Sequence, residues 1–245
     1  MKKMNLNKKD VIYLSVISVL LIITIVLSVS LYWANVKKSS WEANDYYNNK
    51  VMSFGIQNAN LSKGQIVFIG DSITDLYPLD DYYAGLNLAC YNRGIGGDTT
   101  SGVINRLQAS IFDLAPSKIV LMIGTNDVDG GVAFDKIISN YRIILDEIKK
   151  NQPTVELYFV SVIPQNEVFQ ESSGLDVTKN NETIKNINKE IKNLCDEYGY
   201  TYVDIFFNLL DEEGYLHKDM SDDGLHLNSN GFEVWTSLLK PHLEK

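Results

Sequence analysis

Short apolar stretches alternate with amphipathic ones along most of the chain, and this pattern predicts an α/β fold. Five stretches rich in β-branched and aromatic residues read as strands, at residues 66–69, 86–91, 118–123, 155–163 and 201–205. Between and after them, apolar residues recur every three or four positions, which indicates helices that lie against a sheet. Strands that alternate with helices form right-handed parallel units. We therefore expect a flavodoxin-like three-layer sandwich with a five-stranded parallel sheet, whose reactive loops lie at the carboxyl ends of the strands.

The N-terminal part has a different pattern, because residues 11–33 contain no charged residue, Pro or Gly. As a helix, this run of 23 residues is long enough to cross the roughly 30 Å hydrocarbon core of a bilayer. It also lacks the polar stripe of a core helix. We expect four segments: a cytoplasmic tail at 1–10, a transmembrane anchor at 11–33, a linker with a leading helix at 34–61, and a globular domain at 62–245.

A cleaved signal peptide is the alternative interpretation of the apolar run. Its apolar region would span about 7–15 residues with small residues at the cut. A cut after Ala34 would instead place the bulky Tyr32 where a small residue is needed. Four lysines precede the run, and positive charge favours the cytoplasmic side. The sequence thus predicts a retained single-pass anchor in the cell membrane, with the N-terminus in the cytoplasm and the bulk of the chain outside.

The charge of the chain limits the classes of molecule that it can bind, and its cysteines indicate neither a metal site nor a redox motif. The net charge is −9, and residues 32–245 hold 18 basic against 30 acidic groups. This acidic balance argues against nucleic acid and against docking on anionic lipid, and it leaves neutral substrates open. Cys90 and Cys195 have no metal-ligand spacing. We expect two buried thiols, with a disulfide as the alternative if the domain is exported.

Candidate chemistry begins with Ser72, which lies just past the first predicted strand in the run Gly-Asp-Ser-Ile-Thr. Open α/β sheets place their reactive groups at this edge. The turn is not the G-x-S-x-G elbow of α/β-hydrolases, because Thr74 stands where that motif has its second glycine. A serine here can also simply cap the next helix, so this stretch alone leaves both interpretations open.

Two further loops at the same edge add polar groups: residues 92–100 are rich in glycine, and Asn126 follows the third strand. Acyl transfer by serine needs a base, an acid that orients the base, and donors for the oxyanion. Among the three histidines, His226 is the best candidate base, because Asp223 precedes it by three residues in a glycine-containing turn. The sequence therefore offers each type of group in the region where it is needed.

Each of these short motifs also has another interpretation. Asp223 and His226 can belong to a surface turn, or to a zinc site with Asp222, although no further His or Cys is placed to complete the ligand set. The glycine turn could cradle a phosphate, although it lacks the Lys of a P-loop. Asn126 alone can be a turn residue.

Taken together, these stretches resemble the SGNH, or GDSL-type, hydrolase family. Four segments match its signature blocks in order: Gly-Asp-Ser at 70–72, residues 92–100, Gly-Thr-Asn-Asp at 124–127 and Asp-Gly-Leu-His at 223–226. The likeness covers about residues 62–240 and looks nearest to the branch of platelet-activating-factor acetylhydrolase-like enzymes and carbohydrate acetylesterases. It implies a nucleophile, a base and an orienting acid, which fall on Ser72, His226 and Asp223.

The resemblance also implies an oxyanion hole from two backbone N–H groups and one side-chain amide. These roles fall on Ser72, Gly97 and Asn126, with Gly96 as a neighbouring alternative for the glycine. No cofactor and no metal are expected, because the sequence shows no complete ligand set.

The sequence thus predicts an extracytoplasmic, membrane-anchored serine esterase. The expected substrates are short acyl esters, in particular O-acetyl groups on a cell-surface glycan, a choice that follows from the predicted location. A lysophospholipase-like lipid esterase is the alternative enzyme. An acyltransferase or glycan-binding relative is the alternative of another class, and the sequence does not determine the acyl acceptor or the oligomeric state.

Overall fold

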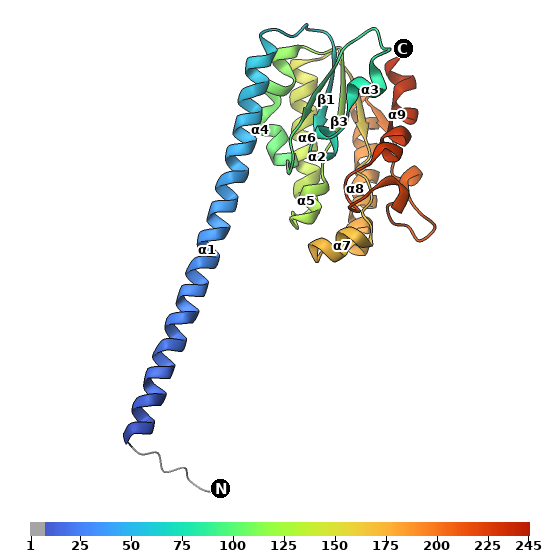
Figure 1. The fold of residues 1–245 in the computed structure, drawn as a ribbon. Coiled ribbons are helices and arrows are strands. Elements are labelled where there is room, and N and C mark those ends of the chain that lie inside the picture. The colour runs from blue at the N-terminus through green and yellow to red at the C-terminus, as the bar shows by residue number, and fades with distance from the viewer. Residues whose placement is uncertain (1–7) are drawn as a thin grey trace. The chain divides into compact units, whose positions relative to one another are not determined.

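The computed structural model describes residues 8–245, and the chain falls into two compact units. One unit ends at Asn48, and the other comprises Asn49–Lys245 (Figure 1). The described part of the first unit belongs to helix α1 (Lys8–Asn58), whose last turns are part of the second unit. Most of the predicted cytoplasmic tail lies outside the described residues.

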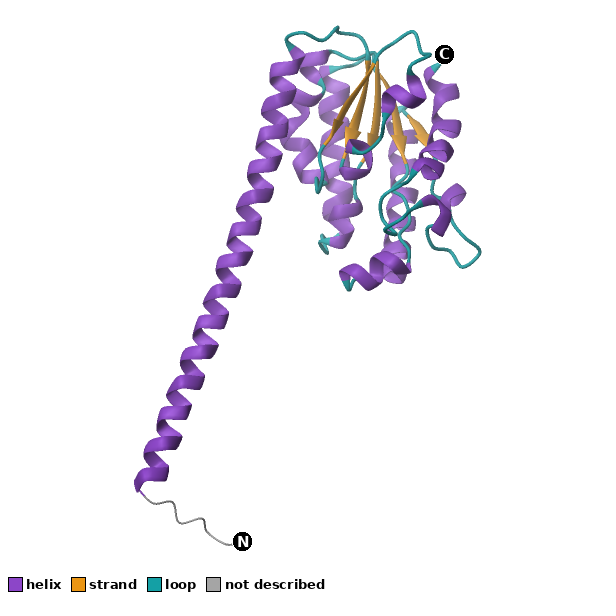
Figure 2. Ribbon diagram, viewed as in Figure 1, coloured by secondary structure: helices purple, strands orange, loops and turns teal. Residues whose placement is uncertain are grey.

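The second unit is built on a parallel sheet of five strands in the order β2-β1-β3-β4-β5 (Figure 2). The strands are β1 (Ile66–Gly70), β2 (Cys90–Gly94), β3 (Lys118–Met122), β4 (Glu156–Val160) and β5 (Thr201–Val203). This order is that of the flavodoxin-like doubly wound fold. The predicted α/β architecture and five-stranded parallel sheet are therefore confirmed.

Helices cover both faces of the sheet. They are α2 (Ser72–Asp75), α3 (Leu79–Tyr83), α4 (Thr100–Ser110), α5 (Thr125–Asp129), α6 (Phe134–Asn151), α7 (Glu167–Ser173), α8 (Val177–Tyr198) and α9 (Ser229–Leu243). Single 3₁₀ turns form η1 (Phe112–Leu114), η2 (Phe207–Leu209) and η3 (Lys218–Met220).

Strand β1 shows how the three layers are held together. Its side chains alternate between the two faces, so Val67 and Ile69 pack with the buried residues of α4, α6 and α8. Ile66 and Phe68 pack on the other face with α3 and α9. Because all five residues of β1 are buried, the strand reads as a continuous apolar run, as expected for the centre of a parallel sheet.

Several element boundaries differ from the prediction. The second strand was expected at residues 86–91 but forms at Cys90–Gly94. The apolar Leu86 and Leu88 pack under the sheet instead. The polar Asn92 fits in the strand because its side chain accepts from Gly94 N–H and donates to the carbonyls of Thr74, Asp75 and Tyr77, in and just after α2. The polar stretch at 165–177, where the sequence pattern predicts no helix or strand, contains α7, which Asn166 caps by accepting from Val168 N–H.

Within the second unit, the last turns of α1 pack against the sheet and its loops. Lys50 Nζ lies 2.7 Å from Asp75 Oδ1, and the Arg93 guanidinium lies 4.7 Å from the centre of the Phe54 ring. Arg93 also donates to Asn58 Oδ1 at 3.0 Å. The compact unit therefore extends upstream of residue 62 into the helix that was predicted to lead away from the membrane.

Among the described residues, no helix combines the length and apolar character that crossing a membrane requires. The transmembrane anchor predicted at 11–33 thus stays a prediction.

Both cysteines are free thiols. Cys195 is buried in α8 and Cys90 is half-buried at the start of β2, so the predicted disulfide alternative does not apply in this structure.

Candidate active site

The end of β1 places Ser72 at the first position of the short helix α2. The cap of that helix is Asp71, whose Oδ1 accepts from Ile73 N–H at 3.0 Å. Capping by Ser72, one of the two interpretations left open by the sequence, is therefore not what the structure shows. Ser72 is half-buried, and its hydroxyl is free to serve another partner.

That partner is His226. Its Nε2 lies 2.9 Å from Ser72 Oγ, and its Nδ1 lies 2.6 Å from Asp223 Oδ2. The contact between Ser72 and His226 joins residues 154 positions apart in the chain, one just after β1 and the other in the loop before α9. The other histidines lie elsewhere: His217 caps η3, and His242 lies near the end of α9.

The Asp223 carboxylate is held by its own turn. Its Oδ1 accepts from the backbone N–H groups of Leu225 and His226 at 2.9 and 2.8 Å. Partial burial opposes its charge, but the hydrogen bonds from the His226 ring and from these backbone groups prevail and lower the pKa of Asp223 to about 2. Asp223 is therefore an acceptor near neutral pH, so Nδ1 of His226 carries the proton. In the neutral ring, Nε2 then accepts from the Ser72 hydroxyl.

Gly224 and Asn166 fix this turn against the rest of the site. Gly224 has φ +81°, and a side chain there would meet Asn166. Asn166 N–H donates to the Gly224 carbonyl at 3.0 Å, and its side-chain amide donates to the Leu216 carbonyl at 3.1 Å. Asn166 was not identified from the sequence. The nearest feature that the sequence offers is Pro164, which directly follows the strand predicted at 155–163.

The glycine-rich turn and Asn126 also meet. Asn126 Nδ2 donates to the Asp98 carbonyl at 2.9 Å, and a side-chain amide keeps a second N–H for another acceptor. Gly97, next to Asp98, is exposed and has φ +76°, a conformation that favours glycine. The structure thus places two of the predicted oxyanion-hole residues in contacting loops, and Gly96 remains the alternative for the glycine role.

A buried arginine, which sequence reasoning missed, holds these loops from below. Arg106 Nε donates to Asp98 Oδ2 at 2.7 Å, and both side chains are almost fully buried. The other guanidinium nitrogens donate to the carbonyls of Arg93 at 2.6 Å and Gly70 at 2.9 Å. One side chain therefore ties together the ends of β1 and β2 and the glycine-rich turn. No short motif marks Arg106, because the two carbonyls that it binds are brought close to it only by the folded sheet.

A second buried network joins the loop after β3 to α4. Thr100 donates to Asp127 through its backbone N–H at 2.8 Å and its hydroxyl at 2.6 Å. Asn140 of α6 donates to the same hydroxyl oxygen at 2.7 Å. Burial raises the pKa of Asp127 above its usual value, and the hydrogen bonds from Thr100 oppose that rise. The aspartate beside Asn126 is thus a structural anchor for that residue.

Asp71 adds a third buried carboxyl group. Burial raises its pKa to about 7, and the nearby Asp98 and Asp127 add to the rise. Its Oδ2 has no hydrogen-bond partner among the described residues. The carboxyl group that caps α2 is therefore a weaker acid than an exposed aspartate.

The zinc alternative finds no ligand set in the described part of the chain, where no three His, Cys, Asp or Glu side chains are grouped to hold a metal ion. Asp222 instead accepts from the Asn228 amide at 3.3 Å.

Comparison with known proteins places this site in a family. Residues 68–234, more than half of the chain, match the model of the GDSL-like lipase/acylhydrolase family. The chain belongs to this family. The resemblance predicted from the four sequence blocks is therefore confirmed, and with it the class of carboxylic ester hydrolases.

Two curated relatives show the range of the family. A multidomain esterase of Ruminococcus flavefaciens is 29% identical over 175 residues, which are 67% of this chain and 21% of the esterase. The human platelet-activating factor acetylhydrolase IB subunit alpha2 is 29% identical over 105 residues, which are 42% of this chain and 45% of the subunit. The chain thus spans less than half the length of these curated relatives.

Solved structures share the fold. A Streptococcus pneumonia protein, provisionally named a platelet activating factor, has a TM-score of 0.78 and 29% identity over 85% of this chain and 97% of its own. A GDSL-like lipase of Bacteroides thetaiotaomicron has a TM-score of 0.70 and 21% identity over 81% of this chain and 98% of its own. At 21% identity, this likeness shows a shared fold and nothing about activity.

We expect Arg106→Ala to lower the free energy of unfolding by about 3–5 kcal/mol, because it leaves the buried Asp98 carboxylate without its partner. Urea unfolding measures the change. The control is Arg142→Ala, which removes an exposed ion pair with Glu197 (N–O distance 2.8 Å) and should cost about 1 kcal/mol or less. Equal losses in the two variants would contradict the role of Arg106.

We also expect a pH-dependent stability difference between the wild type and Asp223→Asn. Because folding lowers the pKa of Asp223 from 3.8 to about 2, its charge stabilises the fold above about pH 4. This contribution is lost as the pH falls toward 2. Thermal unfolding at pH 7 and pH 2.5 should show that the difference in melting temperature between the wild type and Asp223→Asn is smaller at pH 2.5. The control is Asp222→Asn, which removes a neighbouring carboxylate that does not contact His226. If the difference between the wild type and Asp223→Asn is the same at both pH values, Asp223 is not the ionised partner of His226.

Proposed function

We propose that this chain is a serine esterase that acts on short acyl esters, in particular O-acetyl groups of a cell-surface glycan, from the outer side of a membrane. The observation that carries the catalytic part is the hydrogen-bonded series Ser72–His226–Asp223, with distances of 2.9 and 2.6 Å. Both lie within the reach that nucleophilic catalysis requires.

The proposed reaction begins when Ser72 Oγ attacks the ester carbonyl carbon and His226 Nε2 takes the hydroxyl proton. Asp223 stabilises the imidazolium that forms. The backbone N–H groups of Ser72 and Gly97 and the amide of Asn126 hold the oxyanion. When the intermediate collapses, His226 returns the proton to the departing alcohol. Water, activated by the same histidine, then releases the acid and restores Ser72.

The exposure of the site is compatible with an ester whose alcohol part is bulky. The Asp223 side chain is 54% exposed and that of His226 is 29% exposed, so the base lies near the surface. A polymer-bound ester can reach such a position without entering a deep tunnel. The relative named a multidomain esterase supports ester chemistry, and the relative named an acetylhydrolase subunit supports an acetyl group as the acyl part.

The location rests on the N-terminal sequence. Residues 11–33 are uncharged and follow four lysines. The large apolar side chains described there are exposed: Tyr13, Ile17, Leu20, Leu21, Ile22, Ile23, Ile25, Val26, Leu27, Val29, Leu31 and Tyr32. Exposed apolar surface of this extent needs a cover. We assign that cover to lipid, which places the catalytic unit on the far side of the membrane from the lysines.

The catalytic proposal is tested with p-nitrophenyl esters. Ser72→Ala and His226→Ala should each lower turnover of the acetyl ester by about 10³-fold or more, because the nucleophile and base act as a unit. The matched control is His217→Ala, which removes an exposed histidine outside the site. Circular dichroism should show that all variants are folded. Wild-type turnover in folded Ser72→Ala would exclude the assigned nucleophile, and a preference for long acyl chains would favour the lysophospholipase-like alternative.

The anchor is tested in cells that produce the full-length chain. We expect the protein to stay with membranes through a carbonate wash, and the variant Leu20→Lys/Ile25→Lys to be released, since each central lysine costs about 2.5–3.5 kcal/mol of insertion. The control Asn44→Lys/Asn48→Lys adds the same charge outside the apolar run. A soluble mature form that begins near Asn35 would refute the anchor and leave the catalytic assignment intact.

A further inference from the structure

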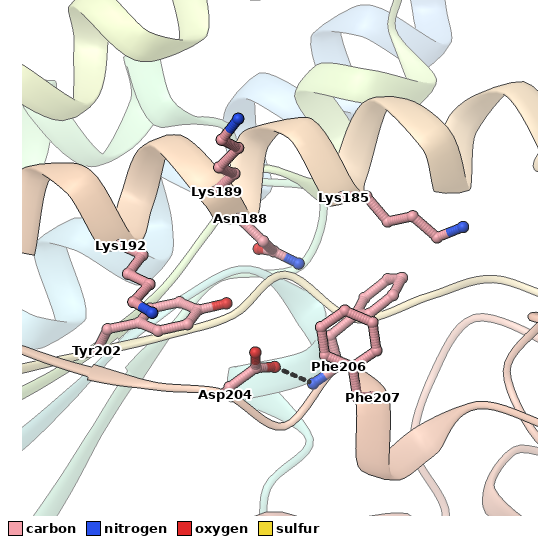
Figure 3. Close-up of a pocket in the computed structure, with 8 residues that line it drawn as sticks. All are labelled: Lys185, Asn188, Lys189, Lys192, Tyr202, Asp204, Phe206 and Phe207. Carbon is pink, nitrogen blue, oxygen red and sulfur yellow. Dashed lines mark hydrogen bonds between the residues drawn. The ribbon is translucent and has the colours of Figure 1, made fainter.

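A pocket lies outside the loops of the proposed active site, between α8 and the segment that follows β5 (Figure 3). Its volume is about 240 Å³. The side chains that define its character are Lys185, Lys189, Lys192, Tyr202, Asp204 and Phe207. The usual ligand pocket measures about 300–1,000 Å³, so this one suits a single ring or a small charged group better than a long chain.

The charge of the pocket is opposite to that of the chain. Three lysines line it, at positions that share one side of α8, while the whole chain carries a net charge of −9. Lys185 is paired with Glu182 at 2.6 Å. Lys189 and Lys192 form no ion pair with any residue that the structure describes. The carboxylate of Asp204 is engaged by Phe206 N–H at 3.0 Å. Three lysines less the carboxylates of Asp204 and Glu182 leave one positive charge at the pocket, which favours an anion.

Aromatic side chains give the pocket a second property. Phe207 is 68% exposed, and its ring is held edge-to-face against the buried Phe206 at 5.4 Å. Burial raises the pKa of Tyr202, so its hydroxyl stays neutral. In Figure 3 Lys192 extends from α8 toward Tyr202. Aromatic faces stack on the apolar C–H face of a sugar ring, and neutral hydroxyls bond to sugar hydroxyls. This combination distinguishes a sugar from a simple anion.

The position of the pocket relates it to the catalytic site. Asp204 directly follows β5, and Ser72 follows the end of β1, so both lie at the carboxyl edge of one sheet. Strand β5 is three places from β1 in the sheet, which corresponds to about 15 Å at the usual strand spacing. One extended polymer can therefore contact both places.

We propose that this pocket binds a sugar unit bearing a carboxylate or phosphate, within the same glycan whose ester reaches Ser72. Lys185 and Lys192 pair with the anionic group, and Phe207 stacks on the ring. The inference rests on the proposed esterase function and narrows its substrate to an anionic polysaccharide. The pocket holds the polymer near the catalytic site and takes no part in the chemical step.

The test measures binding of the full-length chain, kept in mild detergent, to polygalacturonate as an anionic polysaccharide and to dextran as a neutral one. Ser72→Ala should bind polygalacturonate like the wild type, because binding does not require hydrolysis. Lys185→Gln/Lys192→Gln should weaken binding about tenfold, the size expected when two surface ion pairs are lost. Phe207→Ala should weaken it as well. Dextran should bind weakly to every variant.

The matched control is Lys136→Gln/Lys150→Gln on α6. It removes the same charge. Lys136 forms no ion pair with the residues that the structure describes, like Lys192, and Lys150 pairs with Glu147, as Lys185 pairs with Glu182. Equal weakening by the two double variants would reduce the effect to net charge and overturn the proposal. So would equal affinity for dextran, or binding through these lysines to anionic lipid vesicles and not to polygalacturonate. All double variants should hydrolyse p-nitrophenyl acetate like the wild type, so failure of the pocket and failure of the esterase assignment are distinguishable.

Discussion

The ion pair between Arg106 and Asp98 is the interaction on which the catalytic edge depends. A buried guanidinium is tolerated only when its donors are satisfied, and here they reach one carboxylate and the carbonyls of Gly70 and Arg93. These carbonyls lie where β1 and β2 end. The Asp98 carbonyl in turn accepts from Asn126. The position of the loops that carry the proposed nucleophile and the proposed oxyanion donors therefore depends on one buried side chain in α4.

The catalytic series combines a local contact with a distant one. Asp223 and His226 lie on one turn, and backbone N–H groups of that same turn hold the carboxylate. Ser72 comes to them only because β1 and α9 are packed in the same unit. Asn166 secures this meeting, since it joins the loop after β4 to Gly224 inside the turn. The electrostatics agree with the geometry, because a carboxylate that stays ionised fixes the proton on Nδ1 and leaves Nε2 to accept.

Charge is distributed unevenly over this acidic chain, and the unevenness bears on its substrate. Three buried carboxyl groups, those of Asp71, Asp98 and Asp127, lie behind the catalytic loops, where burial raises their pKa values. The lysines of α8 gather at the other end of the same sheet edge. The net charge of −9 therefore does not describe the surface around α8, where lysines make the local charge positive.

The sequence by itself determined the alternation of strands and helices and the four blocks around Ser72, because apolar periodicity and short glycine-containing turns are local properties. The flavodoxin-like sheet order was expected from the general rules for such alternation. It placed β2 too early and missed α7, since Asn92 and Asn166 satisfy polar groups through partners that are distant in sequence. Only the tertiary structure decided that Asp71 and not Ser72 caps α2, and that Arg106, Thr100 and Asn140 support the site. Those roles depend on buried donors meeting acceptors from other elements, a property that no stretch of chain carries alone.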